Sequence, residues 1–153
     1  MASWAEFERL APDFAEATRR LLTGSDGVAI AFLGTVTQAS TPRLAPVCPI
    51  FCGDHLYLSA GARTPKVRDL RAKKVYALHA FLGKNDEELQ FSGASSEVTD
   101  ARERAAVHQA IPFAAFDKRD PIFRLAVESV LWVYWERVGQ PGTRAIRKHW
   151  VSP

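Results

Sequence analysis

The chain has 153 residues, of which 47% are hydrophobic and 24% are charged. This composition is enough for one packed domain and excludes an intrinsically disordered chain. The formal net charge of +3 suits an anionic ligand but does not by itself indicate nucleic acid. Apolar runs such as residues 28–33 are too short to cross a bilayer, and the first ten residues lack the apolar core of a signal peptide. We therefore expect a cytoplasmic protein without membrane contact.

Residues 1–24 are predicted to form an N-terminal helical segment. Ser3 and Glu6 have the spacing of a capping box, which marks the start of a helix. Pro12 lacks an N–H group and is predicted to divide the segment into two pieces. Gly24 and Gly27 are predicted to end it. We expect this segment to pack on the barrel as a lid or plug.

Residues 28–151 are predicted to form a barrel with inserted helices. Apolar and β-branched runs predict strands at 28–37, 43–51, 55–59, 75–81, 89–99, 127–138 and 144–151. Helices are expected at 65–73 and from Asp100 to about Ala110, and residues 112–121 read as irregular. Pro46 and Pro49 place the second strand at a sheet edge, because proline cannot donate to a ladder. The order predicts one domain over 1–153, mainly β with α decoration and antiparallel rather than doubly wound.

The sharpest local signal is the segment from Ser59 to Lys66. Thr64 is a favourable N-cap residue, and Pro65 suits the first position of a helix. A helix N-terminus exposes free N–H groups, and Arg63 and Lys66 would add two cations beside them. This arrangement predicts a phosphate site, although an ordinary capped helix with a solvated basic face fits the same pattern. Arg43 starts a strand and either reaches the same phosphate or is a solvated strand end.

The two cysteines predict neither a disulfide nor a metal site. Cys48 and Cys52 are four residues apart, which on an extended strand separates them by roughly 13 Å. The four histidines are scattered singly, so a complete set of metal ligands is not evident. We expect buried free thiols and no metal. His79, alone on a strand face, is interpreted as a hydrogen-bonded structural residue.

The late strand at 127–138 is apolar on both faces. Val130, Trp132 and Tyr134 share one face, and Leu131, Val133 and Trp135 share the other. Such a strand must be covered on both sides, which predicts a dimer interface, with core packing as the alternative. No dinucleotide fingerprint, phosphate-binding loop of the Walker type or nucleophile elbow occurs in the sequence. What remains is redox chemistry supplied by a cofactor, or simple binding.

Three consecutive segments carry a family resemblance: GTVTQASTPRLAPVCPIF, then DHLYLSAGARTPKVRDLRAKKVYALHAF, then ELQFSGASSEVTD. They are similar to the pyridoxamine 5′-phosphate oxidase-like, FMN-binding split-barrel proteins, over roughly residues 28–100. The closing strands LWVYWERV and AIRKHWV also resemble that family. The resemblance implies a six-stranded antiparallel split β-barrel. It also implies a homodimer with the cofactor at the subunit interface.

The resemblance further implies which residues hold the cofactor. The phosphate would lie at Ser59, Arg63, Thr64 and Lys66, with Arg43 helping to hold the cofactor. The flavin ring would run along Pro46, Val47 and Cys48. The partner subunit would contribute late-strand residues, with Trp132, Trp135 and Trp150 as weaker candidates, of which Trp135 is included among the predicted cofactor-binding residues.

The implied function is an FMN-dependent oxidoreductase that acts on an unknown small molecule. The chain lacks the basic, proline-containing C-terminal pattern of the true oxidase, so pyridoxamine phosphate is not the expected substrate. The alternatives are a deazaflavin-dependent reductase and a non-enzymatic flavin- or haem-binding protein, with His79 as the residue that keeps haem open. Nucleic-acid binding is not expected, because Tyr76 is the only aromatic residue near the basic run at 63–74.

Overall fold

The computed structural model describes residues 1–112 and 117–153, so part of the predicted irregular stretch at 112–121 lies outside the described residues. Helices α1 and α2 precede the first strand, α3 lies between β4 and β5, and α4 lies between β6 and β7. The helices span α1 Trp4–Leu10, α2 Pro12–Leu22, α3 Pro65–Lys73 and α4 Ala101–Ala110, with a 3-10 turn at Lys84–Asp86. The strands span β1 Ala31–Val36, β2 Pro42–Val47, β3 Ile50–Cys52, β4 His55–Ser59, β5 Val75–Ala80, β6 Glu88–Glu97, β7 Ile122–Glu136 and β8 Arg144–Val151.

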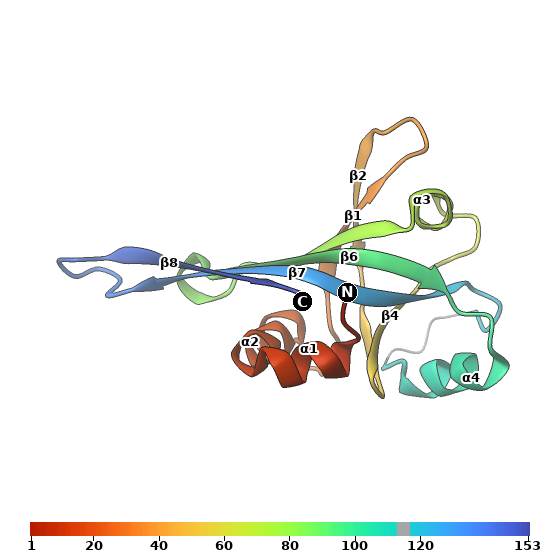
Figure 1. Cartoon of the computed structure of the whole chain (residues 1–153), viewed down its shortest axis with the longest axis horizontal. Helices are drawn as coiled ribbons and strands as arrows, with labels where there is room; N and C mark the ends of the chain where they lie inside the picture. The colour runs from red at the N-terminus through yellow and green to blue at the C-terminus, as the bar shows by residue number, and fades with distance from the viewer. Residues whose placement is uncertain (113–116) are drawn as a thin grey trace.

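The strands form one antiparallel sheet that curls into a half-barrel (Figure 1). The order is β2-β1-β5-β6-β7-β4-β3, and β8 pairs with β7 outside this path. β2 and β3 are therefore the two ends of the order although they are neighbours in sequence. The inner face of the curl holds the main core, which includes Leu33, Leu78 and Phe91. This arrangement confirms the predicted split barrel and the edge position of β2.

The described residues form eight strands where the resemblance implied six. Residues 48 and 49 divide the predicted strand at 43–51 into β2 and β3, since Pro49 has no N–H to donate. The seventh strand begins at Ile122 rather than at residue 127. Its first residues were missed because Arg124 interrupts their apolar character. β8 then extends the sheet beyond the barrel path.

The N-terminal segment forms the two predicted helices. Ser3 caps α1, because its hydroxyl accepts from the Glu6 N–H while Glu6 accepts from the Ser3 N–H. Pro12 is the first residue of α2, so the division at this proline is confirmed. Trp4 and Phe7 are fully buried in the core, and α1 and α2 lie together beside the long strands (Figure 1). No helix in the described parts of the chain is long and apolar enough to span a membrane.

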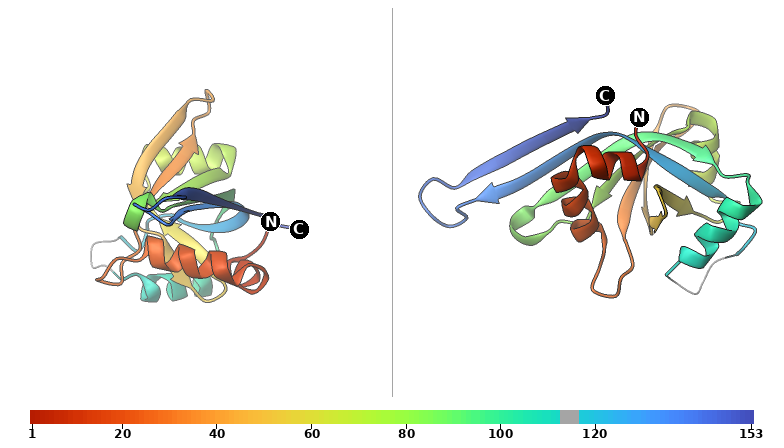
Figure 2. Two further views of the ribbon diagram at one scale, coloured as in Figure 1. Left: turned by 90° about the vertical axis from the view of Figure 1, so that its left-hand side faces the viewer. Right: turned by 60° about the horizontal axis from the view of Figure 1, so that its bottom comes forward.

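One extra residue in β7 changes which of the strand's alternating side chains point to the core. Ser92 pairs with Ser129 and Gly93 with Val127, so Glu128 is left over as a bulge. Buried Val127 precedes the bulge and buried Val130 follows it, which keeps apolar side chains on the core side throughout. A Cβ on Gly93 would lie 1.9 Å from the Ala126 carbonyl oxygen, so this crossing requires glycine. Beyond it, β7 and β8 project from the body as an arm (Figure 2).

Candidate cofactor site

The α3 turn, residues 59–66, joins the end of β4 to the start of α3. Pro65 is the first residue of the helix, and Val67 and Leu70 are fully buried in the core, as the helical spacing predicted. Lys66 is half-buried and Arg63 is exposed. The first turn of α3 contains no acidic residue. The helix N-terminus therefore carries free N–H groups and has two cationic residues close by in sequence, with no acid in the first turn.

Thr64 occupies the predicted N-cap position without capping the helix. Its backbone is extended, but its hydroxyl makes no hydrogen bond to α3. The Oγ1 atom is buried and has no hydrogen-bond partner among the residues that the structure describes. Leaving a buried hydroxyl unpaired costs free energy, so such an atom calls for a ligand or ordered water. Nearby, the Ala62 N–H is already occupied, because it donates to the Asp120 carboxylate at 3.3 Å.

Arg43 lies on β2 and reaches the middle of α3, not its N-terminus. Its Nε donates to the Asp69 carboxylate at 2.8 Å, and the Thr35 hydroxyl donates to the same oxygen at 2.8 Å. Asp69 is 6% exposed, so this pair fixes α3 against β1 and β2 from inside the curl. The structure thus gives Arg43 a protein partner. Sequence reasoning missed Asp69, although an acid between Val67 and Leu70 on the buried side of a helix was a visible signal.

The three residues predicted along the ring lie where β2 ends, but they differ in exposure. Pro46 is exposed, Val47 is buried and Cys48 is half-buried in the break before β3. Burial raises the pKa of the Cys48 thiol, and the nearby Asp26 carboxylate raises it further. Cys48 is therefore a neutral thiol at neutral pH. Both cysteines are free, and no cluster of three metal-binding side chains occurs within residues 1–112 and 117–153.

The outer face of the sheet carries a groove beside β2. One hollow of about 730 Å³ is lined by Phe32, Leu44, His79, Ala80, Phe81 and Leu82. Leu44 also lines a second hollow of about 550 Å³ that extends over Gly34 and Ala77. We call these two hollows the outer groove. Leu44 and Leu82 are 68% and 62% exposed, which makes the groove an uncovered apolar surface.

The strand register explains why this face is hollow. Leu44, Gly34, Ala77, Ser92 and Ser129 follow one another across β2, β1, β5, β6 and β7 as cross-strand neighbours. Four of these five side chains are small, so they leave a flat floor. The adjacent row joins Pro46, Phe32, His79 and Gln90. A planar group resting on this floor would meet the imidazole of His79 at its edge.

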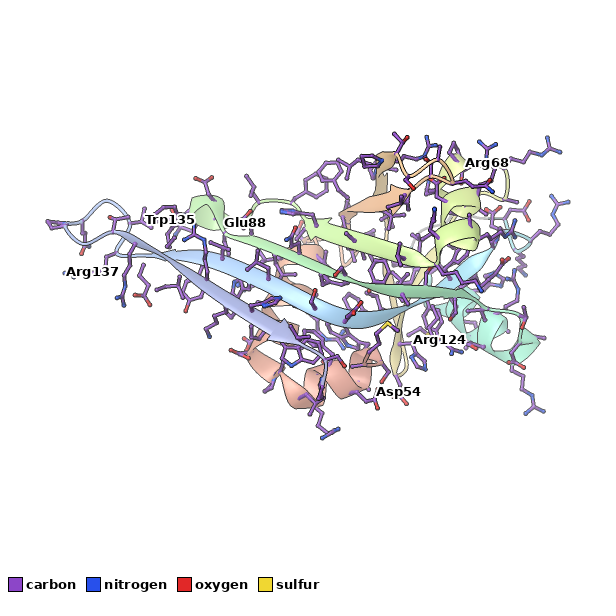
Figure 3. All side chains as sticks on the ribbon, turned by 45° about the horizontal axis from the view of Figure 1, so that its top comes forward. Asp54, Arg68, Glu88, Arg124, Trp135 and Arg137 are labelled. Carbon is purple, nitrogen blue, oxygen red and sulfur yellow. The ribbon has the colours of Figure 1, made fainter. Side chains whose placement is uncertain are left out.

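The late-strand tryptophans divide into two kinds. Trp132 packs on Phe14 and donates its indole N–H to Glu87, and Trp150 packs on Phe7, so both belong to the chain's own interior. Trp135 is 43% exposed. Figure 3 places Trp135 and Glu88 at the end from which the arm projects, away from Arg68 on α3. One copy of the chain therefore does not bring Trp135 to the α3 turn.

A second polar cluster fixes α4 against β4 and β7. The Glu103 carboxylate accepts from the Tyr57 hydroxyl at 2.8 Å and from the Arg124 guanidinium at 2.6 Å. The Arg124 hydrogen bonds hold the pKa of Glu103 below its usual range, whereas burial raises the pKa of Tyr57 to about 12. All three groups satisfy one another. Sequence reasoning did not find this cluster, because its members are 46 and 21 residues apart.

No protein-family model matches the chain, and no curated protein matches it by sequence. Solved structures do match it. A putative 5-nitroimidazole antibiotic resistance protein from Bacteroides thetaiotaomicron is similar with a TM-score of 0.62 and 15% identity, over 75% of this chain and 80% of that one. A protein described as an F420 reductase is similar with a TM-score of 0.56 and 18% identity, over 73% and 94%.

A third solved structure covers the most of this chain among these three. It is a Clostridium acetobutylicum protein related to general stress protein 26, described as of the pyridoxinephosphate oxidase family, with a TM-score of 0.58 and 13% identity over 94% of each chain. Identities this low bear on architecture alone. Together with the curled antiparallel sheet, they show that the chain has the split-barrel fold of the pyridoxamine 5′-phosphate oxidase-like proteins.

Proposed function

We propose that the chain is a cytoplasmic FMN-dependent oxidoreductase that binds the cofactor phosphate at the α3 turn and works as a homodimer. The buried, unpartnered hydroxyl of Thr64 carries the proposal. It lies at the start of a helix without acidic residues in its first turn, beside Arg63 and Lys66. A phosphate there would satisfy the hydroxyl, the free N–H groups and both cations together.

The residues of the α3 turn fit a phosphorylated flavin. Thr64, Arg63, Lys66 and the end of β4 at Ser59 would hold its phosphate, and Pro46, Val47 and Cys48 would lie along its ring. When bound, the flavin supplies the exchange of a hydride with a small organic substrate. The protein's part is to hold the ring in place and exclude water. The neutral Cys48 thiol is consistent with a packing role beside the ring rather than nucleophilic attack.

A second copy of the chain is the occupant that we propose for part of the exposed outer face. Leu44, Phe81 and Leu82 are 68%, 45% and 62% exposed and line one continuous groove. Apolar patches of this kind on a folded chain mark interaction sites. The exposed Trp135 on the arm would then reach the cofactor of the partner copy. Sedimentation of the purified protein tests this part, and a monomer at micromolar concentration would contradict it.

An absorbance spectrum of the protein as purified tests the cofactor. Flavin bands at close to one FMN per chain would support the proposal. Tight uptake of the deazaflavin with no uptake of FMN would move the assignment to a deazaflavin-dependent reductase. A Soret band with added haem and no flavin uptake would favour the haem-binding alternative. Bound flavin that neither a nicotinamide nor a panel of small molecules reduces would indicate a binding protein.

A further inference from the structure

A separate hollow lies at the opposite end of α3 from the α3 turn. It has a volume of about 370 Å³ and is formed by the C-terminal end of α3, the end of β6 and the start of β7. Figure 1 shows α3 beside this end of β6. The described lining combines two cations, two hydroxyls and one carboxylate with the apolar side chains of Leu70 and Phe123. We call it the Ser95 hollow.

Ser95 brings a buried hydroxyl without a partner to this hollow. The residue is 4% exposed, and its Oγ has no hydrogen-bond partner within residues 1–112 and 117–153. The backbone of Ser95 is satisfied, since its N–H donates to the Lys74 carbonyl oxygen at 2.8 Å. A buried hydroxyl left in this state costs free energy unless a ligand or an ordered water supplies the missing bond.

The charged side chains of the Ser95 hollow leave one positive charge without compensation. Arg71 donates from Nε and Nη2 to the Glu97 carboxylate at 2.8 and 2.7 Å, so these two residues neutralise each other. The hydrogen bonds from Arg71 also hold the pKa of Glu97 below its usual range, which keeps the carboxylate charged at neutral pH. Lys74 makes no ion pair among the described residues. Its ammonium group is therefore available to an anion.

The backbone of Lys74 is in the left-handed region, with φ of 55° and ψ of 22°. Glycine adopts this conformation at the end of a helix without the steric cost that a lysine incurs. A non-glycine residue held in such a conformation is a reason to ask what its side chain does. The same backbone permits a clean experiment, because glycine at this position removes the ammonium group without opposing the fold.

Charge and wall chemistry together select the kind of ligand. A phosphate group carries about −1.5 to −2 charges at pH 7, which exceeds the single free cation and would be repelled by Glu97 and by the carbonyl end of α3. A single negative charge matches Lys74. Leu70 and Phe123 are each 1% exposed and give the hollow an apolar wall for an organic chain. The volume is at the lower end of the range for small-molecule sites.

We propose that the Ser95 hollow binds a small organic monocarboxylate. Its carboxylate would accept from the Lys74 ammonium and the Ser95 hydroxyl, and its apolar chain would lie against Leu70 and Phe123. Such a ligand joins the end of α3 to β6 and satisfies the buried hydroxyl. The site does not depend on the proposed flavin function, because the α3 turn lies at the other end of the helix.

The first test titrates butyrate into the full-length protein and follows the backbone amide signals of Ser95 and Ser96 by NMR. A saturable shift of both signals is expected. Butanamide, which has a similar size and no charge, and inorganic phosphate at equal ionic strength are the controls, and neither should shift these signals. An absent or non-saturating response to butyrate overturns the inference. An equal response to butanamide or to phosphate overturns the assignment to a monocarboxylate.

The second test repeats the butyrate titration on three variants. Lys74→Gly should weaken butyrate at least tenfold while its melting temperature is kept or raised, so lost binding would not reflect lost folding. Ser95→Ala should weaken butyrate several-fold without lowering the melting temperature. Lys73→Ala is the matched control, since it removes the neighbouring exposed cation and should leave the affinity unchanged. Unchanged affinity in Lys74→Gly or Ser95→Ala, or equal weakening in Lys73→Ala, overturns the inference.

Discussion

Helices α3 and α4 have similar N-terminal sequences, but their capping side chains differ in whether they are hydrogen-bonded. Each follows a strand, has a residue suited to capping before its first turn, and carries a cation at its second position, Lys66 in α3 and Arg102 in α4. In α4 the Asp100 carboxylate accepts from the Glu103 N–H at 2.8 Å, and Glu103 is satisfied by its neighbours. In α3 the Thr64 hydroxyl is buried without a partner in the described parts of the chain.

The comparison of these two helix N-termini shows how a ligand site differs from an ordinary helix N-terminus. An N-terminus that the chain completes with its own carboxylates serves stability. One that keeps its cations, lacks acids and buries an unpaired hydroxyl leaves room for an anion from outside. The contrast has consequences at matched positions. Ligand affinity should depend on α3, and folding stability should depend on α4.

The largest effect is expected from Lys66→Ala. Losing a charge-assisted hydrogen bond to phosphate should weaken FMN binding by roughly 1.5–3 kcal/mol, which is about 10- to 150-fold. The unfolding free energy should change little, because Lys66 makes no ion pair among the described residues. Fluorescence titration of FMN measures the affinity. Arg102→Ala, at the same position of α4, is the control. If both variants bound FMN equally weakly, the proposed difference between the N-termini of α3 and α4 would be contradicted.

Glu103→Gln tests the other side of the contrast. It should lower the unfolding free energy at neutral pH by about 1.5 kcal/mol, since the carboxylate loses its charge-assisted bonds to Arg124. The folded pKa of Glu103 is lowered, so its contribution is complete above its ordinary value of 4.5 and is lost as the pH falls through the folded value. Urea unfolding at pH 7 and pH 3 should show a gap between wild type and variant that closes in acid. A gap of constant size would contradict the assignment.

A pair of cap substitutions should separate the two functions at about 1 kcal/mol each. Thr64→Val removes a hydroxyl without a protein partner, so it should weaken FMN several-fold while thermal stability is kept or slightly raised. Asp100→Ala removes an occupied cap and should cost about 1 kcal/mol of stability with FMN affinity unchanged. Melting curves and FMN titrations on both variants test whether Thr64→Val affects only affinity and Asp100→Ala only stability. A Thr64→Val variant that melts lower with normal affinity would make Thr64 structural.

Inorganic phosphate should give the smallest effect. At a concentration equal to its Kd, a ligand that binds only the folded chain stabilises it by about 0.4 kcal/mol. The melting temperature of the wild type should therefore rise slightly with phosphate, and that of Lys66→Ala should not. Chloride at equal ionic strength is the control for general screening. A rise of the same size in both proteins would show that phosphate acts elsewhere.

The sequence predicted most of the fold because its signals are local. The capping box at Ser3, the division at Pro12 and the start of α3 at Pro65 each depend on a few neighbouring residues. The break of the second strand was only half visible. Pro46 sits within β2 at a sheet edge, whereas Pro49 ends the pairing and divides the strand. The charge of Arg124 concealed the early start of β7 in the sequence. Its ion-pair partner Glu103 lies on another element, so the sequence did not show that this charge is compensated.

The candidate site was less predictable, because its features depend on distant pairings. Local pattern identified Thr64 and Lys66 but not the unpaired state of the Thr64 hydroxyl. Arg43 was assigned by resemblance, and its ion pair with Asp69 depends on how α3 lies over β1 and β2. The outer groove arises from register, which places Gly34 beside Ala77 across two strands. Composition and periodicity do not contain that information.

The bulge at Glu128 affects how this chain can be compared with others. The extra residue shifts the inward positions of β7 from odd to even numbers, so that Val127 and Val130 share one side. An alignment to a relative with a regular strand needs a one-residue gap at this point. Without the gap, every later residue of the arm is matched to the opposite face, and Trp135 is equated with a core position. Transfer of partner-contacting residues along the closing strands should therefore start from the structure-based register.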